Sequence, residues 1–431
     1  MRRLFFAAVA TLAISASAAS GAPPDADTRF GTFNASLNRP FNTLNLPSGT
    51  GLLTVHLSDP NVDDQFRRQA KNVAEVIQRI RPDVLLINEF DPLQTGDIGV
   101  APGPENLFRD NFLEVSQNGA APIQYPYAFI AVSNTGVPTG MDLNNFGGAV
   151  TTPGAPGYGD DSFGFGAFPG QFGMVVYSKY PIAYDHVRTF RLFKWKDMPG
   201  NLIPTPFYSP DEVDILRLSS KSHWDIPIQI GKKTVHFLVS HPTPPVFDGD
   251  EDRNGRRNHD EIRFWADYVT PGKAGYIYDD EGQFGGLKPG ELFVIAGDQN
   301  SDPVDGDSIP GSIQQLLDHP LVNTKLTPES AGGTEAAAQG GNNAGHEGDP
   351  RFDTADFGDF GPFGPGNLRV DYVLPRKNLQ LVDSGIFWPL QADPLSRLTG
   401  LFDFAAWGLV GGFPTSDHRS VWIDVTVPTV K

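Results

Sequence analysis

The chain has 431 residues, of which 39% are hydrophobic, 19% charged and 11% aromatic. These proportions exclude an intrinsically disordered chain, because disorder requires few aromatic residues and a high density of charge. Lys and Arg number 33 against 51 Asp and Glu, so the net charge is −18. Such an acidic balance is atypical of proteins that bind nucleic acid through a broad basic surface.

The first residues have the pattern of a secretory signal peptide. Arg2 and Arg3 give a positive start, an apolar run follows over residues 4–14, and small residues lead to Ala18. This run is too short to span a bilayer, and no later segment has the roughly 18 apolar residues that a spanning helix needs. We therefore expect a signal peptide over 1–18, a secreted or periplasmic protein, no membrane span, and a single domain over 19–431.

The sequence contains no Cys. Disulfides and thiolate metal ligands are therefore excluded. Any metal must be bound by oxygen and nitrogen atoms, and that donor set suits Mg²⁺, Mn²⁺ or Ca²⁺.

In chain order, the apolar patterns predict alternating strands and helices. Helices are predicted over 66–80 and 262–269, where Pro82 and Pro271 end them. Segments of about 91–170 and 328–366 show little periodicity and are predicted to be long loop insertions. Strands are predicted over 29–34, 84–88, 174–177, 234–240, 292–296, 368–374 and 421–427.

Polar side chains suited to metal or proton chemistry recur beside the ends of these strands. Such ends bring distant segments together at one rim of a sheet. Carboxylates are the ligands that hard divalent cations prefer, and nearby His side chains donate to phosphate oxygens or transfer protons. The residues are Glu89, His241, Asp298, Asn300, Asp417 and His418.

Seven segments in order resemble the endonuclease/exonuclease/phosphatase superfamily, over residues 29–428. The segments are Phe30-Gly-Thr-Phe-Asn34, Leu85-Leu-Ile-Asn-Glu89-Phe, Val175–Ile182, Phe237–Pro242, Ile295–Asn300, Arg369–Leu374 and Ser416–Arg419. The resemblance implies an α/β (α+β) fold, a four-layer α/β-sandwich of two packed mixed β-sheets flanked by helices. It also implies a hydrolase of phosphoester bonds.

The resemblance implies a metal site as well. In that site Glu89, Asn34 and Asp417 bind Mg²⁺, or Mn²⁺ or Ca²⁺ in its place. Some members of the superfamily have an acidic residue two positions after the first asparagine, where this chain has Ser36. The number of metal ions therefore stays open.

Five further residues receive catalytic roles from the resemblance. Asp298 positions or deprotonates the attacking water, and Asn300 holds the phosphate or the metal. His241 and His418 contact the phosphoryl group, and Asp371 orients His418. Together these groups imply metal-assisted hydrolysis by in-line attack of water.

Residues 250–261 fit a calcium-loop pattern, with acidic or amide residues at the ligand positions. This interpretation predicts an additional structural Ca²⁺. A second interpretation assigns Arg256 or Arg257 to a substrate phosphate, because guanidinium groups bind phosphate with paired hydrogen bonds. In a third, these arginines pair with nearby aspartates on a solvated loop. The proposed calcium ligands are Asp250, Asp252, Asn254 and Glu261.

Three functions remain open at this point. The first is an exported metal-dependent phosphoesterase acting on phosphomonoesters or phosphodiesters. Its acidic charge favours a small molecule, since binding of a polyanion relies on basic groups. The second is a secreted DNA or RNA endonuclease with the same active site, and the third is a non-catalytic calcium-binding module. No partner protein is implied.

Overall fold

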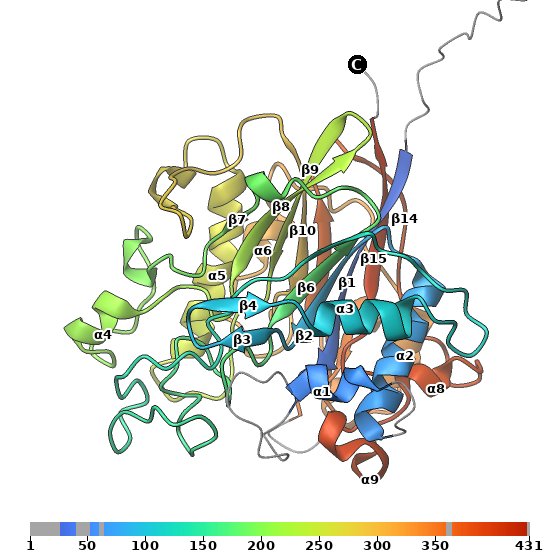
Figure 1. Cartoon of the computed structure of the whole chain (residues 1–431), viewed down its shortest axis with the longest axis horizontal. Helices are drawn as coiled ribbons and strands as arrows, with labels where there is room; N and C mark the ends of the chain where they lie inside the picture. Colours follow the sequence, from blue (N-terminus) through green and yellow to red (C-terminus); the bar gives the residue numbers. More distant parts are fainter. Residues whose placement is uncertain (1–25, 40–51, 60–63, 359–363, 429–431) are drawn as a thin grey trace, which may run out of the picture.

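The computed structural model describes residues 26–39, 52–59, 64–358 and 364–428. Two β-sheets lie face to face, with α2 and α5 on opposite sides of them (Figure 1). The predicted signal peptide, 1–18, lies outside the described residues. The expected mixed α/β architecture is therefore confirmed.

The first sheet has six strands in the order β14-β15-β1-β2-β6-β5. Its central strands β1 and β2 are parallel, and β15 and β6 flank them in antiparallel orientation. The bounds are β1 Ala26–Leu37, β2 Val84–Phe90, β5 Tyr127–Phe129, β6 Met174–Ser178, β14 Gln380–Ile386 and β15 Val421–Val427.

The second sheet has five strands in the order β13-β10-β9-β8-β7. Here β9 and β10 are parallel, and β13 pairs with β10 in antiparallel orientation. The bounds are β7 Arg188–Thr189, β8 His223–Ile230, β9 Lys233–Ser240, β10 Leu292–Asp298 and β13 Asp371–Pro375. Two small hairpins pair β3 Leu93–Thr95 with β4 Gly99–Ala101, and β11 Ala355–Asp356 with β12 Asn367–Leu368.

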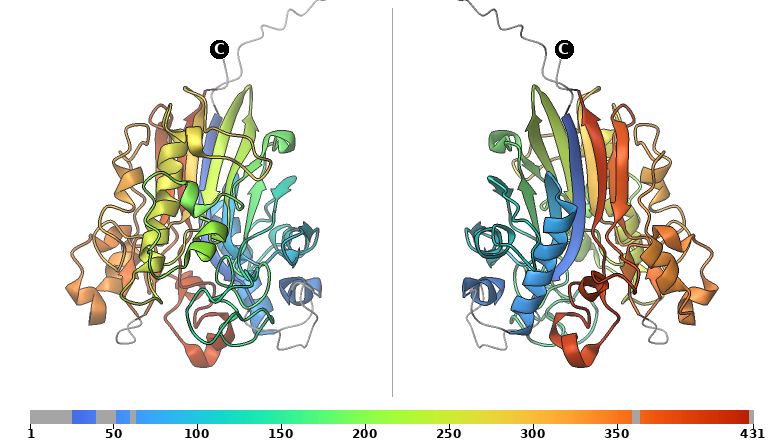
Figure 2. Two further views of the ribbon diagram at one scale, coloured as in Figure 1. Left: turned by 90° about the vertical axis from the view of Figure 1, so that its left-hand side faces the viewer. Right: turned by 90° about the vertical axis from the view of Figure 1, so that its right-hand side faces the viewer.

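Helices form the outer layers, and Figure 2 shows them on both outer faces. The α-helices are α1 Leu52–Ser58, α2 Gln65–Ile80, α3 Pro104–Phe108, α4 Pro210–Ile215, α5 Arg253–Val269, α6 Gln314–Leu317, α7 Ala331–Ala337, α8 Ser396–Thr399 and α9 Phe404–Trp407. Single turns are η1 Arg109–Leu113, η2 Tyr184–His186, η3 Trp195–Asp197, η4 Ala274–Tyr276, η5 Gly341–Gly345, η6 Pro350–Phe352 and η8 Gly408–Val410.

The alternation of side chains along the strands produces three apolar layers. On β1, Phe30 packs between the sheets while Phe33 packs against the helices of the first sheet. On β10, Val294 lies between the sheets while Ile295 faces the layer that contains α5. Because successive strand residues point to opposite faces, each central strand contributes to two layers. The order helix, sheet, sheet, helix is the four-layer arrangement expected from the sequence.

The first predicted insertion is only partly loop. Residues 91–170 contain the β3–β4 hairpin, α3 and η1, and β5 extends the first sheet by pairing with β6. These elements are too short to show the apolar periodicity on which the sequence prediction relies. Residues 328–366 similarly contain α7 and the hairpin strand β11. Within the described residues, no helix combines the length and apolar character required to cross a membrane.

Candidate active site

Five polar residues face the space between the sheets because they continue the apolar alternation of their strands. Asn34 follows Phe30 by four positions on β1, and Asp298 follows Ala296 by two on β10. Asn88 and His241 likewise follow Leu86 and Val239 by two, with His241 one residue past the end of β9, and Asp371 precedes Val373 by two on β13. Period-two geometry therefore brings side chains from both sheets to one buried region.

Glu89 reaches the same region by a break in the alternation. Its φ is +58°, a left-handed conformation that few residues other than glycine adopt. Asn300 and Ser36 also have positive φ, at 50° and 48°. Such conformations cost about 1–3 kcal/mol each and persist where surrounding structure holds them. Three of them beside one cluster indicate that the backbone is held for the site rather than for regular sheet pairing.

Gly297 allows the close approach of β9 and β10 at this point. Its φ is +143°, and a Cβ there would lie 2.1 Å from the carbonyl oxygen of Ser240. Only glycine satisfies both conditions. Asp298 and His241, the residues that follow these two positions, are consequently brought together.

Asn34 joins the two sheets through hydrogen bonds to two carboxylates. Its Nδ2 lies 3.1 Å from Glu89 Oε1 and 3.0 Å from Asp298 Oδ2. Asn38 Nδ2 donates to the other oxygen of Glu89 at 2.7 Å. Glu89 is thus held in one orientation by two amide donors.

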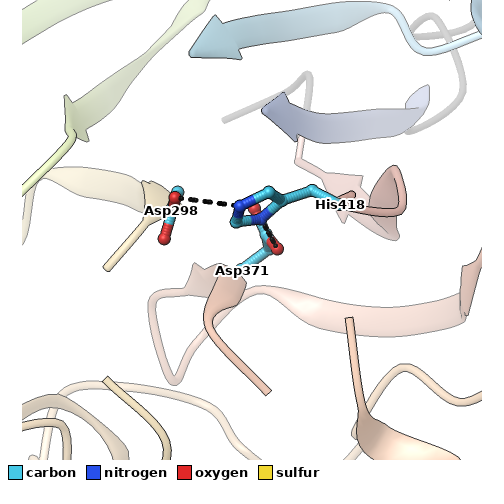
Figure 3. Close-up of side chains that lie close together, drawn as sticks. All are labelled: Asp298, Asp371 and His418. Carbon is cyan, nitrogen blue, oxygen red and sulfur yellow. Dashed lines mark hydrogen bonds and ion pairs between the residues drawn. The ribbon is translucent and has the colours of Figure 1, made fainter. Parts of the chain in front are cut away.

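His418 lies between two buried carboxylates, as Figure 3 shows. Its Nδ1 is 2.9 Å from Asp371 Oδ2, and its Nε2 is 3.6 Å from Asp298 Oδ2. Burial by itself lowers the pKa of His418, but Asp371 and Asp298 outweigh it and raise that pKa well above its ordinary value. The two carboxylates therefore favour the imidazolium form of the ring.

His241 lies on the other side of Asp298, with Nε2 3.4 Å from Asp298 Oδ2. Burial, together with the ammonium of Lys221, lowers the pKa of His241 to about 4. Its Nδ1 is buried and has no hydrogen-bond partner among the described residues. A neutral ring that donates from Nε2 to Asp298 accounts for this geometry.

Asp298 is ionised between the two rings. Burial alone would raise the pKa of Asp298, but the charge of His418 and the hydrogen bond from His241 lower it below its ordinary value. The Asn300 backbone N–H also donates to its Oδ1 at 2.8 Å. A carboxylate in this setting accepts a proton or orients a water molecule.

Glu89 has the properties of a metal ligand. Burial and the nearby Asp417 carboxylate raise the pKa of Glu89 to about 7, although His418 acts in the opposite direction. A divalent cation would supply the positive charge that these two carboxylates lack. The carboxylates of Glu89 and Asp417 therefore suit a hard cation, whereas Asn34 presents Nδ2 to Glu89 and its Oδ1 accepts from the Ser36 N–H at 3.3 Å.

A second set of potential ligands is formed by Asp298, Asp371 and His418, whose ligand atoms lie within 4.8 Å of one another. Both nitrogens of His418 already face carboxylates in this set. The arrangement fits a hydrogen-bonded relay better than a vacant coordination sphere, because a ligating ring nitrogen must be free of its proton.

The sequence profile of the Endonuclease/Exonuclease/phosphatase family matches residues 31–418. The chain belongs to this family. The resemblance seen in the sequence is thus confirmed over most of the chain.

Solved structures of several family members are similar to this one. An endonuclease/exonuclease/phosphatase from Beutenbergia cavernae DSM 12333 is 16% identical, with a TM-score of 0.46 over 93% of this chain and 72% of its own. Sphingomyelinase C from Streptomyces griseocarneus is 13% identical, with a TM-score of 0.41 over 93% of this chain and 99% of its own. Identities this low carry no information on substrate. No curated protein matches the chain in sequence.

The predicted calcium loop is not formed. Residues 253–269 are helix α5, so Asn254 and Gly255 lie in its first turn instead of in a cation-binding loop. Glu261 is buried, and its carboxylate accepts hydrogen bonds from the backbone N–H groups of Ser220 and Thr243, each at 2.6 Å. The residue pattern of a calcium loop is present in the sequence. The Glu261 carboxylate, which would be its last ligand, is already bonded to the backbone of other segments. The predicted ligands Asp250 and Asp252 precede this helix.

The two arginines of this segment bond to the chain itself. Arg257 donates to the carbonyl oxygens of Leu218, Phe163 and Arg217. Arg256 donates to the carbonyl of Glu251 at 2.9 Å. Arg257 therefore fastens the first insertion to α5, and these contacts give no support to a substrate role for either arginine.

Four residues of the site region were not identified from the sequence. Asn88 accepts from the backbone N–H of Asp298 at 3.1 Å, and Thr354 donates to Asp371 Oδ2 at 2.9 Å. Asn38 donates a hydrogen bond to Glu89, and the charge of Lys221 lowers the pKa of His241. Asn88 lies inside the Leu85–Phe90 segment, where the alternation of side chains along the strand places it on the same face as Leu86. The other three lie in loops, where no periodic pattern reveals them.

Proposed function

We propose that the protein is an exported, divalent-metal-dependent hydrolase of small phosphoesters. The observation that carries the proposal is the buried cluster in which Asp298 lies between a neutral His241 and a charged His418. Members of the family hydrolyse phosphoester bonds, and this cluster contains an acceptor for water and a cationic donor for a phosphoryl oxygen.

In the proposed reaction, Asp298 accepts a hydrogen bond from the attacking water and takes its proton. His418 donates from Nε2 to a phosphoryl oxygen, while Asp371 accepts from Nδ1 and fixes the orientation of the ring. His241 donates a hydrogen bond from Nε2 to a second phosphoryl oxygen or to the leaving oxygen. As water attacks phosphorus, the bond from phosphorus to the leaving oxygen breaks, and that oxygen takes a proton from solvent. A cation held by the carboxylates of Glu89 and Asp417 would stabilise negative charge on the phosphoryl group.

A small substrate is favoured by the charge beside the site. Asp302 follows Asn300 closely, and its Oδ2 accepts from the backbone N–H of Arg369 at 2.7 Å, two residues before Asp371. Burial and the charges of Asp302, Asp305 and Asp349 raise the pKa of Asp353 to about 7. A polyanion close to Asp302, Asp305 and Asp349 would be repelled, because nucleic-acid binding depends on basic groups along the phosphate backbone. The net charge of −18 acts in the same direction.

Export is part of the proposal and rests on the Arg2-Arg3 start and the short apolar run that follows. Expression of the full chain with its own leader tests this part. The expected product outside the cytoplasm begins at residue 19, and N-terminal mass spectrometry checks it. An intact Met1 on the exported or cell-associated product would contradict export by cleavage.

Activity of the mature protein tests the chemistry. A chromogenic phosphomonoester, a chromogenic phosphodiester and plasmid DNA are assayed with EDTA, Mg²⁺, Mn²⁺ or Ca²⁺, at several salt concentrations. We expect turnover of a small ester that is lost in EDTA and in His241→Ala. His186→Ala is the matched control, since His186 is exposed and remote from the cluster in sequence.

The outcomes separate the alternatives. DNA cleavage with the same dependence on metal and His241 would identify a nuclease instead of a small-ester hydrolase. Metal binding without turnover of any of the three substrates would favour a binding module and contradict the proposal.

A further inference from the structure

We infer that Lys221 binds a phosphoryl oxygen of the substrate and that the first insertion holds this lysine in place. The inference rests on the proposed function, because it assigns a further residue to the same site. It concerns two parts of the chain, residues 219–222 before β8 and the insertion residues 133–166.

Strand pairing places Lys221 beside the catalytic cluster. His223 pairs with Ser240 in the antiparallel ladder of β8 and β9, so the residues just before His223 lie alongside His241 and Pro242. Ser220 Oγ lies 3.3 Å from the carbonyl oxygen of His241, which fixes the two segments together. Lys221 is buried at this position, with an exposed fraction of 6% for the whole residue.

The charges around Lys221 are those of the active site. Burial lowers the pKa of Lys221, whereas Glu261, Glu89 and Asp298 raise it. Its charge in turn lowers the pKa of His241. The ammonium therefore lies within electrostatic range of Glu89, Asp298 and His241, which surround the proposed phosphoryl position.

No group in the described part of the chain accepts a hydrogen bond from this ammonium. Lysine carries three donors, and an ammonium in a residue this buried is costly because water reaches it only in part. Glu261 does not require it, because Ser220 and Thr243 already donate to its two oxygens. An ammonium kept at this cost beside a phosphoryl site is suited to an anionic ligand, since phosphate accepts strong charge-assisted hydrogen bonds.

The first insertion determines where Lys221 lies. The backbone N–H of Asn134 donates to the carbonyl of Lys221 at 2.9 Å, and its side chain donates to the carbonyl of Ser219 at 2.8 Å. Gly164 packs so tightly on this segment that a Cβ would lie 1.8 Å from the carbonyl oxygen of Ser220. Asn134 and Gly164 belong to one substructure, because Gly164 N–H donates to the Asn134 carbonyl. This part of the insertion is a wall that positions Lys221.

Phosphate inhibition provides a test that is separate from turnover. Inorganic phosphate is the probe, and its inhibition constant and its calorimetric affinity are measured with metal present, beside KM and kcat for the small ester. In Lys221→Met we expect the phosphate inhibition constant and KM to rise roughly 10- to 100-fold, since a charge-assisted hydrogen bond is lost. Lys221→Arg should restore part of the loss, because it retains the positive charge.

The matched control is Lys179→Met. Lys179 forms an ion pair with Asp83 at 2.9 Å, beside the opposite end of β2 from Glu89. Its removal should leave phosphate inhibition unchanged within about twofold, as expected for a partly exposed ion pair away from the site.

The insertion is tested with Gly164→Ala against Gly99→Ala. Both substitutions lie in the first insertion, but an added Cβ at Gly99 contacts nothing within 4 Å. Gly164→Ala should shift the phosphate inhibition constant in the direction of Lys221→Met, and Gly99→Ala should not. Equal phosphate inhibition in wild type and Lys221→Met would overturn the assignment of Lys221. Normal inhibition in Gly164→Ala would overturn the positioning role of the insertion.

The result also separates this inference from the proposed function. If the wild type turns over no phosphoester and binds no phosphate, the proposed function fails and this inference fails with it. If the wild type is active and Lys221→Met has the same phosphate inhibition constant and KM as the wild type, this inference fails but the proposed function stands. A fall in the melting temperature of Lys221→Met without any change in phosphate affinity would assign Lys221 to folding instead.

Discussion

His241 and His418 lie on either side of Asp298, yet their surroundings give the two rings different charges. Asp371 accepts from Nδ1 of His418, and two carboxylates make that ring an imidazolium. His241 has no partner at Nδ1 among the residues that the structure describes, and Lys221 is nearby, so burial and that charge favour the neutral ring. The difference teaches that the group behind each ring, and not its distance from Asp298, determines whether the ring is a charged or a neutral donor.

The largest expected effect is the loss of the charged ring. In His418→Ala we expect kcat to fall roughly 10³- to 10⁴-fold, because both a cationic donor and the partner of Asp298 are lost. His241→Ala should cost less, roughly 10²- to 10³-fold, since only a neutral donor is removed. Steady-state kinetics on the small ester at saturating metal measures both. An equal or larger loss in His241→Ala would contradict the difference in charge between the rings.

Asp371→Asn sharpens the comparison by removing the carboxylate behind His418. We expect kcat to fall roughly 10²-fold, because an amide neither stabilises the imidazolium nor fixes its tautomer. The wild-type pKa of His418 is raised, so the charged ring persists to high pH and is lost as pH rises through that pKa. The basic limb of the pH–rate profile should therefore move to lower pH in Asp371→Asn. An unmoved basic limb would show that His418 does not carry the required charge.

Glu89 differs from Asp298 in that burial and the neighbouring Asp417 outweigh the positive charge near it, so its ionised form is disfavoured. Its pKa is raised from 4.5 to about 7, so in the metal-free protein its ionisation destabilises the fold as pH rises through that range. Glu89→Gln removes this penalty. At pH 8 in EDTA the variant should be more stable than the wild type by roughly 3 kcal/mol, with little difference near pH 4.5.

Urea unfolding at both pH values measures this difference. Saturating Mg²⁺ should reverse the order, because it stabilises the ionised wild-type carboxylate but not the amide. A stability difference that is the same at both pH values and unaffected by metal would exclude Glu89 as a buried metal ligand.

Much of the fold and part of the site follow from the sequence. The strand alternation that puts Phe30 and Ala296 in the core also sends Asn34 and Asp298 into the space between the sheets. The positions of Asn34, His241, Asp298 and Asp371 are therefore determined by local pattern once the strands are recognised. The four-layer order, in contrast, was implied by the resemblance to the family.

Other parts depend on contacts between residues distant in the sequence. Glu89 enters the site through a positive φ, which no apolar pattern encodes. The calcium pattern at 250–261 was misleading because the Glu261 carboxylate accepts hydrogen bonds from the backbone N–H groups of Ser220 and Thr243. Lys221 was missed for the related reason that it lies in a short loop whose position is determined by Asn134 and Gly164. Spacing along the chain identifies strand faces but not the partners that occupy a side chain.

The smallest expected effect comes from Thr354, which bonds to Asp371 and, in the described part of the chain, makes no hydrogen bond to His418. Its Oγ1 donates to Asp371 Oδ2 at 2.9 Å and accepts from the backbone N–H groups of Val370 and Asp371. Thr354→Val keeps the shape but removes these bonds, so kcat should fall only about three- to tenfold. Thr354→Ser is the control, because it retains the hydroxyl and should retain most of the activity. If Thr354→Val lowered kcat as much as Asp371→Asn, the orientation of the carboxylate, and not its charge alone, would govern the difference between His418 and His241.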